Sequence, residues 1–105
     1  MKVALYTRVS TSAQDDGLQR RELAQLAAAR GWQVVAELGE TISGVADDRP
    51  GLAQLRALVV ARSIDVVAVW KLDRLGRSTI ELLTILDELR AAGIAFVSAT
   101  DGFDT

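Results

Sequence analysis

Short apolar runs alternate with longer amphipathic segments along this chain, and no other feature limits its fold as much. The apolar runs predict strands at residues 2–8, 32–38, 65–70 and 95–97. The spacing of apolar side chains between them predicts helices from residue 15 or 16 to 30, over 50–62 and over 79–92. Strands that alternate with helices form a mostly parallel sheet covered on both faces. We therefore predict a three-layer α/β domain, with four to five strands in the order 2-1-3-4 and helices on both faces of the sheet.

The composition fits one compact domain and removes several kinds of chemistry. With 105 residues, half of them hydrophobic, the chain is long enough for one domain and too short for two. It has no cysteine and no histidine, which excludes disulfides, Cys/His zinc sites, thiol nucleophiles and Ser-His-Asp triads. It also lacks a secretory signal pattern and any apolar run near the roughly 18 residues of a membrane span. We therefore expect a cytoplasmic protein with no membrane partner.

The charge balance is unusual for a protein that would act on nucleic acid. The formal net charge is −2, although ten of the twelve basic residues are arginine. Affinity for a nucleic-acid backbone grows with the number of phosphates that the protein neutralises. If DNA is the substrate, most of the binding energy must come from outside these residues.

Polar and charged side chains gather after the predicted strands. Arg8 and Ser10 follow the first strand, an aspartate and two arginines are among the residues after the third, and Arg49 ends the turn after the second. Because the carboxyl ends of adjacent parallel strands meet over one crevice, these loops should open on one edge of the sheet, beside the first helix. The candidate catalytic residues are Ser10, Arg8, Arg49, Asp73, Arg74, Arg77, Gln14 and Gln19.

A hydroxyl surrounded by guanidinium groups suits nucleophilic attack on a phosphate. Phosphoryl transfer requires positioning and cations over the charge that develops on the transferring group. Guanidinium stays charged and donates two parallel hydrogen bonds to phosphate oxygens. Several arginines can replace a divalent ion, and the acidic residues form no evident metal-binding cluster, so we predict neither a metal nor another cofactor.

Each of these residues also has an ordinary structural explanation. Ser10 alone is typical of a turn or a helix cap. The acid–base pair at 73–74 is typical of a surface ion pair, and Gln14 and Gln19 of solvated helix positions. Arg49 differs, because a helix start is electrostatically the wrong end for a cation, and this favours a functional role.

Taken together, the motifs are more specific than any single residue, and the chain closely resembles the catalytic domain of serine recombinases, the resolvase/invertase family. The resemblance covers essentially the whole chain, including Asp101-Gly102-Phe103-Asp104-Thr105. The motifs that carry it are Tyr6-Thr7-Arg8-Val9-Ser10-Thr11 with Gln14 and Gln19, Ser43-Gly44, Asp48-Arg49-Pro50-Gly51-Leu52, and Lys71-Leu72-Asp73-Arg74-Leu75-Gly76-Arg77.

The resemblance implies site-specific DNA recombination, as in resolution, inversion or integration of DNA and in transposons. Ser10 would attack a DNA phosphodiester, form a covalent bond to the 5′ phosphate and release a 3′ hydroxyl, which attacks back after strand exchange. The phosphoserine ester takes the place of the broken DNA phosphodiester bond, so neither ATP nor another energy source is implied. Arg8, Arg49, Arg74 and Arg77 match the phosphate-binding arginines of the family. Gln14, Gln19 and Asp73 match its accessory polar positions.

The group that activates Ser10 stays open at this point. Without histidine, the candidates are Asp73, a water polarised by arginine, and the substrate itself. Asp73 would serve equally well as an acid for the departing 3′ oxygen, or as a residue that orients Arg8 or Arg74.

The resemblance also implies partners and missing parts. Family members continue into a long helix that pairs subunits and then into a DNA-binding domain, and they form dimers that become tetramers on DNA. We therefore expect residues 1–105 to be a catalytic domain truncated before that helix, with double-stranded DNA as the partner of the full-length protein. On its own, the domain should be a monomer or a weak oligomer.

The last predicted helix has a wide apolar face that leaves a second function open. Its apolar residues span roughly 160°, with Ile80 beyond that arc, which is more than one sheet face usually covers. Either the helix is deeply buried, or part of the face meets another subunit or a missing segment. The alternative function is thus a non-catalytic α/β module for oligomerisation or interaction. A nucleotide-binding or phosphoacceptor domain is disfavoured, because the chain has neither a Gly-x-Gly-x-x-Gly nor a Walker A pattern, and its first strand ends in arginine and serine rather than paired aspartates.

Overall fold

The computed structural model describes residues 1–9, 13–41, 50–70, 79–100 and 103–104. Strands and helices alternate in this part of the chain, as predicted. The elements are β1 (Lys2–Val9), α1 (Ala13–Arg30), β2 (Gln33–Thr41), α2 (Pro50–Ala61), β3 (Val66–Val69), α3 (Thr79–Ala91), β4 (Ala95–Ser98) and β5 (Phe103–Asp104).

The strands form one sheet in the order β2-β1-β3-β4-β5 across the described ranges. β1 pairs in parallel with both β2 and β3, and β4 pairs in parallel with β3. The short β5 pairs antiparallel with β4 at the edge. The predicted order 2-1-3-4 is therefore confirmed.

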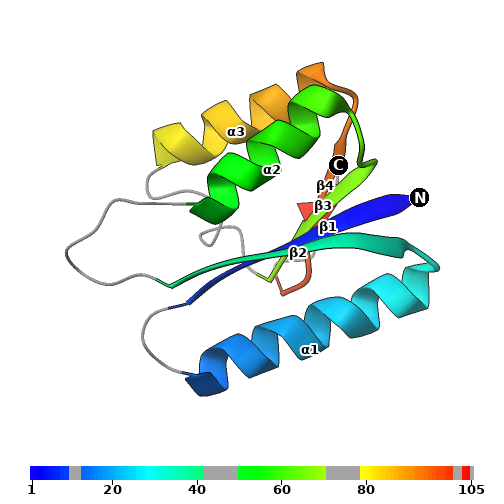
Figure 1. The fold of residues 1–105 in the computed structure, drawn as a ribbon, viewed down its shortest axis with the longest axis vertical. Coiled ribbons are helices and arrows are strands. Elements are labelled where there is room, and N and C mark those ends of the chain that lie inside the picture. Colours follow the sequence, from blue (N-terminus) through cyan, green and yellow to red (C-terminus); the bar gives the residue numbers. More distant parts are fainter. Residues whose placement is uncertain (10–12, 42–49, 71–78, 101–102, 105) are drawn as a thin grey trace.

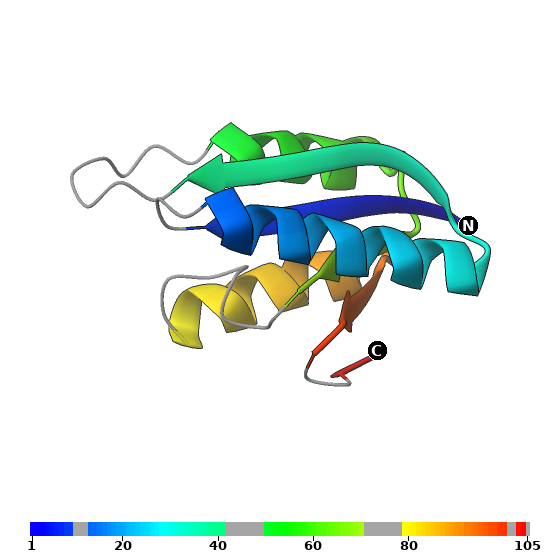
Figure 2. The same cartoon turned by 90° about the horizontal axis from the view of Figure 1, so that it is seen from below.

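Helices cover both faces of the sheet, and each face has its own hydrophobic core (Figures 1 and 2). In Figure 1, α1 lies below the sheet, and α2 and α3 lie above it. Leu23 and Ala27 of α1 pack against the odd-numbered residues of β1. The larger core on the other face combines the even-numbered residues of β1 with buried residues of both helices, namely Leu52, Leu55, Val59, Ile85 and Leu89. When both faces of a strand are covered, its sequence is a continuous apolar run. This explains why the apolar runs of β1 and β3 predict strands.

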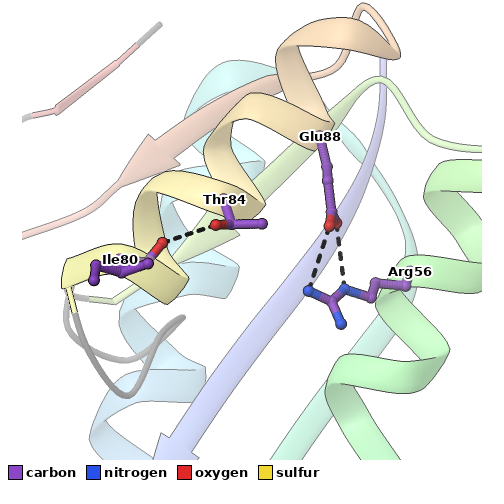
Figure 3. Close-up of polar contacts among 4 residues, drawn as sticks. All are labelled: Arg56, Ile80, Thr84 and Glu88. Carbon is purple, nitrogen blue, oxygen red and sulfur yellow. Dashed lines mark hydrogen bonds and ion pairs between the residues drawn. The ribbon is translucent and has the colours of Figure 1, made fainter.

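The face of α3 is only partly covered. Ile85 and Leu89 are buried, but the side chain of Leu83 is 59% exposed and that of Ile80 is 79% exposed. The interpretation of α3 as a deeply buried helix is therefore wrong for this part of its face. On the side that faces α2, Arg56 donates two hydrogen bonds to Glu88, at 3.3 and 3.4 Å (Figure 3). None of the helices described here is long and apolar enough to span a bilayer.

Each described helix is followed within two residues by a residue in the left-handed conformation. Gly31 follows α1 with a φ of 69°, and Gly93 lies after α3 with a φ of 74°. The corresponding residue after α2 is Arg62, with a φ of 52°. Glycine adopts this conformation freely, whereas a side chain there costs about 1–2 kcal/mol.

We therefore expect Arg62→Gly to raise the free energy of unfolding by about 0.5–1 kcal/mol, because relief of strain exceeds the greater freedom of glycine in the unfolded chain. Thermal denaturation should show a melting temperature about 2–8 °C higher. The matched control is Gly93→Ala, which introduces a side chain at a similar φ with no described atom within 4 Å of it. This variant should melt below the wild type. A less stable Arg62→Gly protein would contradict this explanation.

Candidate active site

The carboxyl ends of β1, β2 and β3 lie at one edge of the sheet, on the left of Figure 1. The parallel register pairs Val9 with Thr41, and Tyr6 with Val69. In the sequence, Ser10 follows Val9 directly, residues 42–49 follow Thr41, and residues 71–78 follow Trp70. The three segments that carry the candidate residues therefore leave the sheet from neighbouring strands.

The described residues include only part of the predicted site. Ser10, Arg49, Asp73, Arg74 and Arg77 lie outside them, so their assignment stays a prediction. Gln14 lies in the first turn of α1, and nothing is described of its side chain. Arg8 and Gln19 are the members of the predicted set whose side chains are described, and the side chain of Gln19 contacts the backbone of Arg8.

Arg8 lies one residue before the end of β1, where it is half-buried and pairs in register with Glu40 of β2. Side chains alternate between the faces of a strand, so Arg8 shares the face of Ala4 and Tyr6, which is covered by α2 and α3. A guanidinium group held on a strand is positioned more firmly than one on an unsupported loop. Arg8 is therefore a cation carried on a strand, two residues before Ser10 in the sequence.

Gln19 is completely buried, although its side chain is polar. Its amide nitrogen Nε2 donates a hydrogen bond of 3.4 Å to the backbone carbonyl of Arg8. This contact ties the second turn of α1 to the last residues of β1. The interpretation of Gln19 as a solvated helix position is therefore wrong, and the residue contacts the backbone beside the candidate nucleophile.

Two further residues at this edge are absent from the predicted set. Trp70 follows β3, and its indole Nε1–H donates a hydrogen bond to the Glu22 carboxylate on α1. Glu22 comes three residues after Gln19, which places both on one face of the helix. That spacing was visible in the sequence, but the register of α1 on the sheet was not.

The helices add a favourable field at the same edge. α1, α2 and α3 begin at Ala13, Pro50 and Thr79, each on the side of the sheet where the preceding strand ends (Figure 1). A helix N-terminus carries a partial positive charge and unpaired backbone N–H groups, both of which favour an anion. Arg8 and the helix starts are thus the described features of this edge that favour an anion, whereas Glu40, in register with Arg8, opposes it.

Comparisons of the sequence with known proteins point to one protein family. The family described as "Resolvase, N terminal domain" matches residues 3–105. The serine recombinase gin of Escherichia phage Mu is 45% identical over 100 residues, which cover 95% of this chain and 48% of that protein. The transposon Tn552 resolvase of Staphylococcus aureus is 41% identical over 98 residues, covering 93% of this chain and 45% of that protein. The chain thus spans about half the length of these curated relatives.

The fold is also similar to a solved catalytic domain. The crystal structure of the N-terminal catalytic domain of TP901-1 integrase superimposes with a TM-score of 0.86 and 37% sequence identity. The match covers 100% of this chain and 82% of that one. From the family match, the sequence identities and the shared fold, this chain belongs to the resolvase/invertase family of serine recombinases.

Proposed function

We propose that this chain is the catalytic domain of a site-specific DNA recombinase, with Ser10 as its nucleophile. The Ser10 oxygen forms a bond to phosphorus, and the bond from phosphorus to the 3′ oxygen breaks. The DNA then carries a 3′ hydroxyl, and its 5′ phosphate is joined to the serine. Attack by a 3′ hydroxyl on this phosphoserine reverses the step after strand exchange and releases Ser10.

The observation that carries this proposal is the common edge at which β1, β2 and β3 end. Ser10 follows β1 directly, and the backbone carbonyl of Arg8 on the same strand accepts a hydrogen bond from Gln19. The segments that contain Arg49, Asp73, Arg74 and Arg77 begin on the two neighbouring strands. We propose that these segments bring several arginines around one phosphate, where guanidinium groups can supply the positive charge without a metal ion.

We also propose that the intact protein continues into a subunit-pairing helix and a DNA-binding domain. The matched relatives are about twice as long as this chain, which leaves room for such parts. With a net charge of −2, residues 1–105 carry too few cations for tight DNA binding. The intact protein then binds double-stranded DNA as a dimer that becomes a tetramer. We expect the protein to be located in the cytoplasm.

A covalent protein–DNA adduct is the result that tests this function. The intact protein is incubated with a supercoiled plasmid carrying the genomic DNA that flanks its gene, and the reaction is stopped with detergent. We expect a DNA–protein species whose proteolytic fragment contains Ser10 bonded to a 5′ phosphate. The same species should form in EDTA, because arginines supply the positive charge. Adducts on another residue, or no adduct on any flanking DNA, would contradict the proposal.

One observation favours a second function, a module that binds another protein surface. Leu83 and Ile80 of α3 are exposed, and Leu83 lines a groove of about 530 Å³ next to Leu86 and Phe96. If the domain acted only as such a module, Leu83→Ser would abolish assembly, and substitution of Arg8 would leave the function unchanged. The two functions therefore predict opposite results for Arg8.

A further inference from the structure

Trp70 joins three elements at the point where the chain leaves β3. Its indole Nε1–H donates to Glu22 of α1. Its carbonyl accepts hydrogen bonds from the backbone N–H of Thr100 at 3.0 Å and from the Thr100 hydroxyl at 2.5 Å. The Ser98 hydroxyl approaches the same carbonyl at 3.5 Å. The residue before segment 71–78 is thus fixed through its side chain to α1 and through its backbone to the end of β4.

The same face of α1 also holds the end of β1. Gln19 donates to the carbonyl of Arg8, and Glu22 accepts from Trp70 one helical turn further along. Between these contacts and the sheet, Leu23 is completely buried in the core beneath α1. A single helix therefore bonds to the ends of two of the three strands that precede the candidate catalytic segments, β1 and β3.

We propose that Glu22 and Trp70 are positioning residues for DNA strand cleavage. This inference rests on the proposed function. The hydrogen bond between them fixes the end of β3 relative to the end of β1, and hence the start of the Asp73–Arg77 segment relative to Ser10. In this role, neither Glu22 nor Trp70 needs to contact DNA or the reacting atoms. They act by holding the two strand ends in one arrangement.

The distances along the chain make this coupling strong. Asp73 is three residues beyond Trp70, and three residues extend at most about 11 Å. Ser10 is two residues beyond Arg8. Because these connections are short, we expect a shift of Trp70 to change where the following chain starts. In phosphoryl transfer, where catalysis depends on positioning, a misplacement of about 1 Å can lower the rate about 100-fold.

Conservative substitutions separate positioning from general stability. Trp70→Phe keeps the aromatic ring and removes the donor. Glu22→Ala removes the acceptor, whereas Glu22→Gln keeps an acceptor oxygen without the charge. Two matched controls lie away from the edge: Trp32→Phe changes the half-buried tryptophan just before β2, and Glu88→Gln weakens the exposed pair with Arg56 between α2 and α3 (Figure 3).

Three quantities are measured on the intact protein with the plasmid that gives the adduct. These are the rate of adduct formation at saturating protein, the protein concentration for half-maximal DNA binding, and the melting temperature. We expect Trp70→Phe and Glu22→Ala to slow adduct formation by about 10- to 100-fold, with DNA binding within about twofold of the wild type. Glu22→Gln should recover most of the rate. The double variant should be no slower than either single one, because both remove the same hydrogen bond. The two control variants should cleave at the wild-type rate.

The outcomes distinguish this inference from the proposed function. If the wild type forms the adduct and the Trp70 and Glu22 variants form it equally fast per folded molecule, the pair is only structural and the inference alone fails. A lower melting temperature with an unchanged rate leads to the same conclusion. If the wild type forms no adduct at all, the proposed function fails, and the positioning role fails with it.

Discussion

A Ser10→Ala variant of the intact protein is expected to lose DNA cleavage and the covalent adduct while it still binds DNA. The chain has no cysteine or histidine that could replace the serine as nucleophile. Removal of the nucleophile in a covalent mechanism lowers the rate by about 10⁴-fold or more. In a gel that separates free DNA from protein-linked DNA, the adduct band should therefore be absent. Binding by the rest of the protein should change by less than about twofold, because a neutral hydroxyl contributes little to the attraction of phosphates.

The sequence offers a closely matched control for this experiment. Ser12→Ala removes another hydroxyl two residues along the same loop. We expect this variant to form the adduct at close to the wild-type rate, because the proposed role belongs to Ser10 alone. If Ser10→Ala still formed a covalent adduct, another residue would be the nucleophile. If both variants lost the adduct, the loop rather than the Ser10 hydroxyl would be the sensitive element.

The sheet was predictable because its central strands are buried on both faces. Val3, Ala4, Val67 and Ala68 have no exposed surface, so their apolar runs are continuous. The edge strand was harder to predict. β2 continues to Thr41, three residues beyond the predicted end, because it pairs with β1 as far as Val9. The length over which an edge strand pairs depends on its neighbouring strand, so the local sequence alone does not predict it. An irregularity in register opposite Val3 and Ala4 has the same origin.

The site was predictable only in outline. The carboxyl ends of parallel strands meet as a consequence of topology, so the common edge follows from the order 2-1-3-4. The contact of Gln19 with the Arg8 carbonyl and that of Glu22 with Trp70 depend on how far α1 is rotated and shifted on the sheet. Side-chain packing sets that placement to within about an ångström, and a hydrophobic pattern does not specify it to that precision.

Arg8 gives the second large effect, on the rate of adduct formation. We expect Arg8→Ala to lower the rate of adduct formation by about 10³-fold, as found for single arginines in phosphoryl transfer. Arg8→Lys keeps the charge but loses the planar pair of donors, so it should recover only part of this loss. DNA binding should weaken by less than about tenfold, because one phosphate contact is removed from many. The measurement is adduct formation at saturating protein, beside a binding isotherm on the same plasmid.

The matched control is Arg21→Ala, which removes an exposed arginine from α1. Its net charge equals that of Arg8→Ala, so any effect of overall charge on DNA binding is the same in both variants. We expect Arg21→Ala to cleave DNA like the wild type. Equal losses in the two variants would mean that Arg8 contributes only general electrostatic attraction. Full cleavage by Arg8→Ala would show that strand cleavage does not need Arg8, the described cation nearest in sequence to Ser10. Another cation would then have to stabilise the charge on the phosphate, and Arg20 of α1, which lies beside Thr7 and Leu38, would be the next residue to substitute.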